Sequence, residues 1–366
     1  AFAGGLLALL AAGHLLVHAA THLGARLGLT PMVVGLTIVA AGTSAPELAV
    51  VGQSIAADDT ELAVGSIIGS NIANVLLVLG IAAMIGTILV TSRAVRIDIP
   101  VMIAASALFL LFALDGSLGR IDGVVLFTGL VVFVTWTLRT ASRNETTRRI
   151  VPADGATTKL PARPIAREVG KLLVGIAGLA AAARFVVAGA EEIARSLGVP
   201  ELIVGLTIVA LGTSAPEIVT TLVAAVRGQR DLAVGNAVGS NIFNILLVLG
   251  LTAMLAPSGI AISDDALRLD LPILLAAAVA CLPIVAWDHR LNRWEGLLFV
   301  GYYGAYLTFL VLDGTGHRAK DPFALVMVGF VIPLTVVTAA TVILRQRRHH
   351  TTRLDDHADL SKADVG

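Results

Sequence analysis

Eleven long apolar stretches constrain the fold of this 366-residue chain more than any other feature. A bilayer core of about 30 Å is crossed by roughly 20 predominantly apolar residues in a helix, and each stretch meets that length. The stretches are residues 2–24, 31–56, 62–88, 98–115, 122–140, 171–195, 202–226, 232–256, 267–287, 294–313 and 322–344. Only 14% of the residues are charged, against about a quarter in soluble domains. The sequence therefore predicts an all-α polytopic membrane protein with the lipid bilayer as its partner, and it disfavours a soluble enzyme or a nucleic-acid-binding protein.

Basic residues are distributed unevenly between the two sides on which the connecting loops alternate. The longest polar segment, residues 141–169, lies within a region from Arg139 to Lys171 that contains eight basic residues. The positive-inside rule places this segment in the cytoplasm. Alternation then places twenty basic residues inside and five outside, with Arg184 within a span. We therefore expect the N-terminus outside and the C-terminus in the cytoplasm.

The chain contains a long internal repeat. Residues 35–80 recur as residues 205–250 without a gap, at a constant offset of 170, and 26 of the 46 aligned pairs are identical. Both copies contain Gly-Thr-Ser-Ala-Pro-Glu, which ends at Glu47 and at Glu217, followed by Gly-Ser-Asn-Ile-x-Asn. Weaker matches continue over five predicted helices, so the whole five-helix unit is duplicated.

Five is an odd number of crossings, so the second copy enters the membrane from the opposite side and the repeats are inverted. Inverted repeats with interrupted helices are the architecture of secondary transporters, whose ion or substrate site lies near the midplane where the copies meet. The sequence predicts two inverted five-helix repeats plus an eleventh C-terminal helix. The predicted boundaries are 1–140 for the first repeat, 141–169 for a cytoplasmic linker, 170–313 for the second repeat, 314–344 for the extra helix and 345–366 for a cytoplasmic tail.

Each copy carries a proline followed by a glutamate in the middle of a span. Pro46 and Pro216 lack an N–H and clash with the carbonyl four residues earlier, so backbone carbonyls are freed and need a partner. Helical spacing places hydroxyl groups within a turn of each glutamate, and a serine and an asparagine on one face of the next span. These residues are Thr43, Ser44, Ser70 and Asn74 in the first copy and Thr213, Ser214, Ser240 and Asn244 in the second. With Glu47 and Glu217 they predict a cluster of oxygen atoms.

An oxygen-only cluster suits a hard cation. Calcium takes about six to eight oxygen ligands in flexible geometry, whereas magnesium keeps its waters and soft metals prefer Cys, His or Met. Glu47 and Glu217 give the cluster a charge of minus two when both are ionised, which one calcium ion or two sodium ions would neutralise. A buried acid without such a partner costs several kcal/mol or takes up a proton. Because of this electrostatic constraint, either calcium or sodium can occupy the cluster at one time. Exchange of one ion for the other follows.

These motifs resemble the two alpha repeats of the sodium/calcium exchangers in the cation/calcium antiporter superfamily. The resemblance implies ten core helices, calcium and sodium as the transported ions, no cofactor, and a first and sixth span that slide across the other helices to alternate access. The calcium ligands it implies are Glu47, Glu217, Thr43, Thr213 and the carbonyls of Ala40 and Ala210. The sodium ligands and lining residues it implies are Ser44, Ser214, Ser70, Ser240, Asn74 and Asn244. It places the chain in the plasma (inner) membrane of a prokaryote.

Two asparagines bear on how the ions would be coupled. Potassium-dependent members of the superfamily carry aspartate at a position where this chain has Asn74 or Asn244, so the resemblance implies exchange without potassium. The family commonly exchanges three sodium ions for one calcium ion, which would move one net charge. We therefore expect electrogenic exchange, with each charge worth about 2.3 kcal/mol per 100 mV.

Three histidines of the first span form a separate feature. His14, His18 and His22 recur at every fourth residue and so share one face of the helix. Arg184 stands at the position of the sixth span that is equivalent to His14. If these spans move, titration of the histidines near neutral pH would modulate or couple transport. The alternative is that they face lipid headgroups, packed neighbours or an outer vestibule.

Three other functions are weighed against sodium/calcium exchange. A proton/calcium exchanger has the histidine face as its specific support. A calcium-selective channel normally builds its pore from subunit symmetry and not from an inverted repeat within one chain. An intramembrane enzyme with Ser44 or Ser214 as nucleophile would need a nearby base other than a metal-binding glutamate, and the sequence offers none. The sequence does not fix the oligomeric state.

Overall fold

The structure is a computed structural model that describes residues 2–143, 164–198, 204, 210–286 and 289–327. It divides into two units, Ala1–Leu307 and Thr308–Gly366. The boundary falls within the last long helix, Arg293–Gly314, so the first unit contains the other long helices and the beginning of this one. In the second unit the described part comprises the end of one long helix and a short helix, so most of the predicted span 322–344, like most of the linker and all of the tail, lies outside the described residues.

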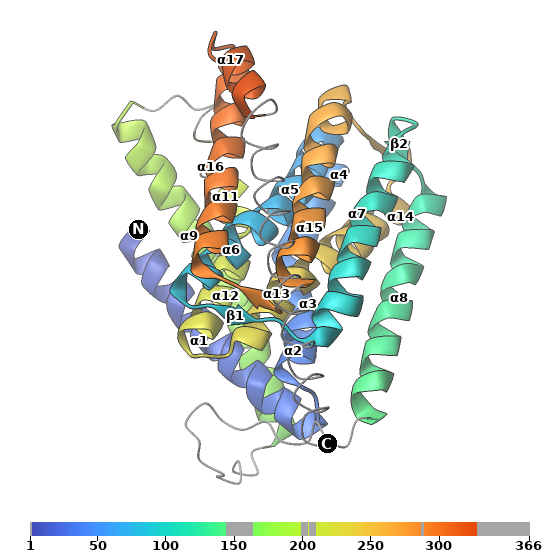
Figure 1. Ribbon diagram of the computed structural model, residues 1–366, viewed down its shortest axis with the longest axis vertical. Helices are drawn as coiled ribbons and strands as arrows, with labels where there is room; N and C mark the ends of the chain where they lie inside the picture. Colours follow the sequence, from blue (N-terminus) through green and yellow to red (C-terminus); the bar gives the residue numbers. More distant parts are fainter. Residues whose placement is uncertain (1, 144–163, 199–203, 205–209, 287–288, 328–366) are drawn as a thin grey trace, which may run out of the picture. The chain divides into compact units, whose positions relative to one another are not determined.

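The first repeat is a run of helices with interruptions inside the spans (Figure 1). Its elements are α1 Phe2–Leu27, α2 Pro31–Val34, η1 Gly35–Val39, α3 Ala40–Thr43, α4 Ala45–Ala56, α5 Thr60–Ala73, η2 Asn74–Val78, α6 Leu79–Ile85, β1 Ile88–Leu89, η3 Ala94–Asp98, α7 Ile99–Ala113, β2 Ser117–Leu118 and α8 Arg120–Arg143, where η denotes a π-helical segment.

The second repeat follows the same order of elements. Its elements are α9 Ile165–Ser196, α11 Ala210–Thr213, α12 Ala215–Val226, α13 Arg230–Phe243, η6 Asn244–Leu249, α14 Gly250–Leu255, β3 Ile260–Ala261, η7 Ala266–Asp270, α15 Leu271–Ala286, β4 Arg290–Leu291 and α16 Arg293–Gly314, and α17 Lys320–Val326 follows it. Within the described residues, eight helical segments are long and apolar enough to cross a membrane. The prediction of a helical, multi-pass membrane protein is confirmed.

Local sequence signals explain where the first span ends and where the second span begins. Gly28 has a φ of 70°, a left-handed conformation that favours glycine and ends α1. Thr30 then caps α2 by accepting a hydrogen bond from the backbone N–H of Val33 at 3.3 Å, and Pro31 occupies the first helical turn. The cap at Thr30 and the proline after it therefore define where the second span begins.

Several spans contain π-helical segments, which the sequence analysis does not predict. Segments η2 and η6 begin at Asn74 and Asn244, which are equivalent positions of the repeat. Segments η3 and η7 also occupy equivalent positions. A π-helical turn widens the helix locally and is frequent at functional sites. Here it reorients the helix at two of the predicted site residues.

Two short antiparallel strand pairs add to the all-α prediction. Strand β1 pairs with β4 and β2 pairs with β3. The loops that carry β1 and β4 are both predicted to be cytoplasmic, and those that carry β2 and β3 are both predicted to be outside. Each pairing therefore joins loops assigned to the same side, which agrees with the predicted alternation.

Reciprocal contacts relate the two repeats by a pseudo-two-fold. A Cβ on Gly5 would lie 3.0 Å from the backbone N of Val186, and one on Gly175 would lie 3.0 Å from Cβ of Leu16. The two contacts interchange at an offset of 170. Because the partner number falls as the number along α1 rises, α1 and α9 are antiparallel, and Figure 1 shows them side by side.

A second reciprocal pair lies among the helices away from α1 and α9. A Cβ on Gly296 would lie 2.5 Å from the carbonyl O of Gly80, and one on Gly123 would lie 2.6 Å from that of Gly250. Gly80 and Gly250 are equivalent at the offset of 170, and Gly123 matches Gly296 at 173. These glycines permit close approach of helix backbones, as small residues do in membrane proteins.

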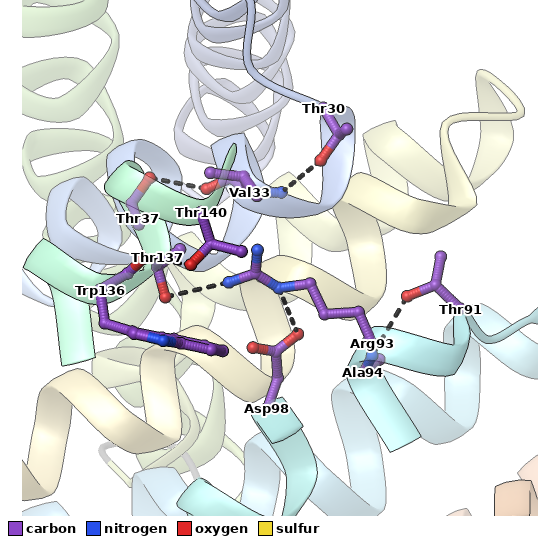
Figure 2. Close-up of polar contacts among 10 residues, drawn as sticks. All are labelled: Thr30, Val33, Thr37, Thr91, Arg93, Ala94, Asp98, Trp136, Thr137 and Thr140. Atoms are coloured by element: carbon purple, nitrogen blue, oxygen red, sulfur yellow. Dashed lines mark hydrogen bonds and ion pairs between the residues drawn. The ribbon is translucent and has the colours of Figure 1, made fainter. Parts of the chain in front are cut away.

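Arg93 pairs with a buried aspartate at the beginning of α7 and also contacts α8 (Figure 2). The Asp98 side chain is fully buried, and its Oδ2 lies 3.5 Å from Nε of Arg93. Nη2 of Arg93 donates to Oγ1 of Thr137 at 3.0 Å, and the guanidinium lies 5.4 Å from the ring centroid of Trp136. Arg93 therefore neutralises a buried carboxylate and fixes α8 at the same time.

Candidate cation-binding site

Both helix breaks predicted from the Ser-Ala-Pro-Glu sequences lie within spans. Helix α3 ends at Thr43 and α4 begins at Ala45, and α11 and α12 repeat this arrangement around Ser214. In each case the proline occupies the first turn of the second helix, where its missing N–H costs nothing. The chain thus presents two helix N-termini inside the membrane-spanning region.

Glu47 and Glu217 lie in the first turns of α4 and α12. Their side chains are 1% and 0% exposed, and the two carboxyl groups are close enough to interact electrostatically. The positive end of each helix dipole favours a negative charge at this position. One half-dipole does not neutralise a buried carboxylate, so the pair still requires a cation or a proton.

The polar groups around the glutamates are buried and largely unsatisfied. All four carboxyl oxygens of Glu47 and Glu217, both amide atoms of Asn74 and of Asn244, and Oγ of Ser44 have no hydrogen-bond partner among the described residues. Buried polar atoms are nearly always paired in folded proteins. Oxygen atoms that converge without donors are the arrangement a desolvated cation requires, so these residues fit a cation as transported substrate.

The hydroxyl groups join the two repeats through reciprocal contacts. Oγ1 of Thr43 lies 3.2 Å from Oγ of Ser240, and Oγ1 of Thr213 lies 3.4 Å from Oγ of Ser70. These contacts interchange at the offset of 170. Oγ of Ser214 also donates to Oγ of Ser70 at 3.1 Å. The structure therefore brings the predicted residues of both copies together at the pseudo-two-fold.

The remaining predicted ligands are backbone carbonyls. Ala40 is fully buried and begins α3, directly after η1. Ala210 begins α11 at the equivalent position. Among the described residues, no three His, Cys, Asp or Glu side chains gather as a potential metal centre. The candidate site consists instead of two carboxylates with hydroxyl, amide and backbone oxygens, the donor set of calcium and sodium.

A cavity of about 440 Å³ leads to one side of this site. Its lining comes from α4, α9, α11 and α12 and is mainly apolar. The lining residues are Ala45, Pro46, Ala49, Val50, Ile176, Ala180, Ala183, Arg184, Val187, Ala188, Glu191, Gly212, Thr213 and Pro216. Thr213 connects the cavity directly with the hydroxyl groups of the site. Arg184, whose position within a span is costly, lies in the cavity wall.

The equivalent region on the other side of the pseudo-two-fold is packed by α1. A Cβ on Gly13 would lie 2.8 Å from Cγ1 of Val219 in α12, so the two helices touch there. Nearer the end of α1, Oγ1 of Thr21 donates to Oε1 of Gln229 at 3.1 Å. The site is thus approached by a cavity beside α9 and is covered by α1.

The three histidines do not join the candidate cation site. His14 contacts Nη2 of Arg227, and the rings of His18 and His22 lie 4.3 Å apart between centroids. The charged neighbours of His18 include Lys171 and Glu168 of α9. The histidine face therefore lies where α1 meets α9 and the end of α12, and its role stays a prediction.

Sequence reasoning missed three buried polar residues next to the site. They are Asn236 in α13 and Thr220 and Thr221 in α12, all fully buried. Asn236 accepts a hydrogen bond from Thr43 at 3.3 Å and donates one to Thr221 at 2.9 Å. The signal that could have identified them is a difference between the repeats, because the equivalent residues are Ser66, Val50 and Val51.

The fold defines a polytopic membrane protein with a buried cluster of oxygen atoms, the candidate cation site, between its two copies. Comparison with known proteins agrees: residues 1–139 and 168–312 match the family described as sodium/calcium exchanger protein. The chain belongs to the sodium/calcium exchanger family, a family of membrane cation/calcium antiporters.

Individual relatives match over nearly their whole lengths. The chain is 34% identical to the inner membrane protein YrbG of Escherichia coli over 310 residues, covering 84% of this chain and 94% of that protein. It is 30% identical to the sodium/calcium exchanger MaX1 of Methanosarcina acetivorans, covering 84% and 96%. Among solved structures, the sodium-calcium exchanger NCX_Mj soaked with zero Na⁺ and Ca²⁺ matches with a TM-score of 0.72 at 25% identity, covering 84% and 96%.

Proposed function

We propose that this protein exchanges calcium for sodium across the plasma (inner) membrane of a prokaryote by alternating access. The observation that carries the proposal is the pair of buried glutamates, Glu47 and Glu217, placed at two equivalent helix breaks with no hydrogen-bond donor on their oxygens among the described residues. A charge of minus two accommodates one calcium ion or two sodium ions, but not both sets together. Because calcium and sodium compete for the same oxygen atoms, the transport of one ion is coupled to the transport of the other.

In this proposal calcium lies between Glu47 and Glu217 and contacts Thr43, Thr213 and the carbonyls of Ala40 and Ala210. Sodium ions use the same carboxylates together with the serines and asparagines of the cluster, which are Ser44, Ser70, Ser214, Ser240, Asn74 and Asn244. Exchange is independent of potassium because the two positions at Asn74 and Asn244 are neutral. Three sodium ions against one calcium ion would then make transport electrogenic.

The cavity beside α9 supports an arrangement open to one side. It reaches Thr213 and the two prolines of the helix breaks, whereas α1 packs on α12 through Gly13 and Val219. With the N-terminus outside and the C-terminus in the cytoplasm, the cavity faces outward. In the alternate state α9 would pack over the site as α1 does here, and α1 would border a cavity as α9 does here. The present cavity would then close and the equivalent cavity on the other side would open.

The experiment is calcium uptake into proteoliposomes at clamped potential, under an imposed sodium, proton or potassium gradient. We expect the sodium gradient to drive uptake and the other two gradients to have no effect. Uptake driven by the proton gradient alone would instead establish the second candidate, a proton/calcium exchanger. That candidate is favoured by one observation, the face of His14, His18 and His22 on α1 next to the charged groups of α9.

A further inference from the structure

The two repeats differ in polarity directly beside the candidate site. Asn236 lies one helical turn before Ser240 in α13, and its equivalent in α5 is Ser66. Segment η1 packs closely on α13 here, since a Cβ on Gly35 would lie 2.5 Å from the carbonyl O of Leu232 and 2.9 Å from the backbone N of Asn236. This close approach brings the Asn236 side chain to α3, which carries Thr43.

Asn236 connects two threonines of different helices. Oγ1 of Thr43 donates to Oδ1 of Asn236 at 3.3 Å, and Nδ2 of Asn236 donates to Oγ1 of Thr221 at 2.9 Å. All three side chains are at most 1% exposed. In this arrangement the amide nitrogen faces Thr221 and the amide oxygen faces Thr43, so the Thr43 hydroxyl donates to Asn236 and cannot accept from it.

The positions equivalent to Asn236 and Thr221 carry different residues in the other repeat. Ser66 is shorter than asparagine, and its Oγ has no hydrogen-bond partner among the described residues. Val51, the equivalent of Thr221, has no side-chain atom that can accept a hydrogen bond. The Thr43 side of the site is therefore held by side chains that the Thr213 side does not have at the matching positions.

The direction of one proton decides what Thr43 offers to a cation. A hydroxyl has one proton and two lone pairs. Two other acceptors lie within reach of Oγ1 of Thr43: the carbonyl O of Ala40 at 3.4 Å and Oγ of Ser240 at 3.2 Å. The Ala40 carbonyl already accepts the backbone N–H of Ser44 at 2.9 Å. When the Thr43 proton goes to Asn236, the second lone pair of the Ala40 carbonyl and the lone pairs of Oγ1 are left for a cation.

We propose that Asn236, held by its hydrogen bond to Thr221, is a positioning residue that takes the Thr43 hydroxyl proton and so leaves the lone pairs of Thr43 Oγ1 for the bound calcium ion. The inference deepens the proposed function and rests on it. It makes the two sides of the site different, since the positions that hold Thr43 are occupied by Ser66 and Val51 in the other repeat.

The test measures calcium binding to the purified full-length protein in detergent, without any ion gradient, so that a failure of exchange and a failure of positioning are distinguished. Isothermal titration with calcium gives Kd for the wild type, Asn236→Ser, Thr43→Val and the double variant. Each of Asn236→Ser and Thr43→Val is expected to raise Kd, and one lost hydrogen bond corresponds to about a two- to ten-fold change.

The double variant separates positioning from general damage. If Asn236 acts through the Thr43 hydroxyl, Asn236→Ser has no further effect in the Thr43→Val protein, whereas independent effects would multiply. Thr221→Val, which installs the residue found at Val51, should raise Kd in the same direction by a smaller factor. Folding of each variant is checked by gel filtration and thermal unfolding without calcium. If Asn236→Ser does not fold, Thr221→Val takes its place in the comparison with Thr43→Val and the double variant.

The matched control is Ser66→Ala at the equivalent position of the other repeat, which should leave Kd unchanged. In proteoliposomes, Asn236→Ser should raise the calcium concentration for half-maximal uptake while leaving the maximal rate near that of the wild type. A wild-type Kd in Asn236→Ser, or an effect of full size in the Thr43→Val background, would overturn the proposal.

Discussion

Replacement of Glu217 by glutamine removes one charge from the candidate site and keeps the size and shape of the side chain. Glu217 is fully buried, and no basic group among the described residues is recorded as its neighbour. In the proposed function its partner of opposite charge is the transported cation. Removing one partner of a buried charge pair costs about 3 to 5 kcal/mol, and about 1.4 kcal/mol corresponds to a factor of ten. We therefore expect calcium affinity to fall by about a hundred- to a few thousand-fold.

The assay is sodium-driven calcium uptake into proteoliposomes over a wide range of calcium concentrations, with Glu47→Gln measured in parallel. Because Glu47 occupies the equivalent turn of the other repeat, its replacement should have an effect of similar size. Glu61→Gln is the matched control, since Glu61 is exposed in the first turn of α5 and its charge is already solvated. Full uptake by Glu217→Gln, or an equal loss in Glu61→Gln, would refute the reasoning.

Three further predictions follow from other parts of the structure. Replacing the three histidines of α1 together by glutamine should flatten the dependence of uptake on pH, and an unchanged pH profile would exclude their regulatory role. Replacing Arg93 by methionine should lower the thermal unfolding midpoint in detergent by several degrees, because Asp98 is left buried and unpaired, and adding Asp98→Asn should recover part of the loss. A cysteine at Val187 in the cavity wall should react with a membrane-impermeant thiol reagent, whereas the native Cys281 is 2% exposed and should not; no reaction at Val187 would contradict an accessible cavity.

The helical spans and the candidate ligands could be predicted from the sequence because independent signals agree there. Hydrophobic length identifies the spans, a proline in each copy identifies the breaks at Ser44 and Ser214, and the repeat pairs each residue with its equivalent. The two glutamates were predicted to meet because a two-fold between inverted copies requires it. In the structure Thr43 contacts Ser240 and Thr213 contacts Ser70, which are equivalent pairs of the two copies.

Other features could not be predicted, for physical reasons. A π-helical turn such as the one that begins at Asn74 differs from an α-turn by one residue in its hydrogen bonding, and hydrophobic periodicity does not resolve that difference. The strand pairs contain two residues each and are fixed by contacts between distant loops. Asn236 could not be predicted from the residues that the two repeats share, because its equivalent in the first repeat is Ser66. The sequence places Arg184 within a span, but only the packing of α9 shows that it lines a cavity.

The measurement that tests the central claim most directly is the reversal of calcium flux in proteoliposomes when voltage and sodium gradient are varied independently. If the buried glutamate pair exchanges three sodium ions for one calcium ion, net flux stops at three times the sodium equilibrium potential minus twice that of calcium, and reversing the sodium gradient reverses the flux. A flux that follows the proton gradient and ignores sodium would contradict the account.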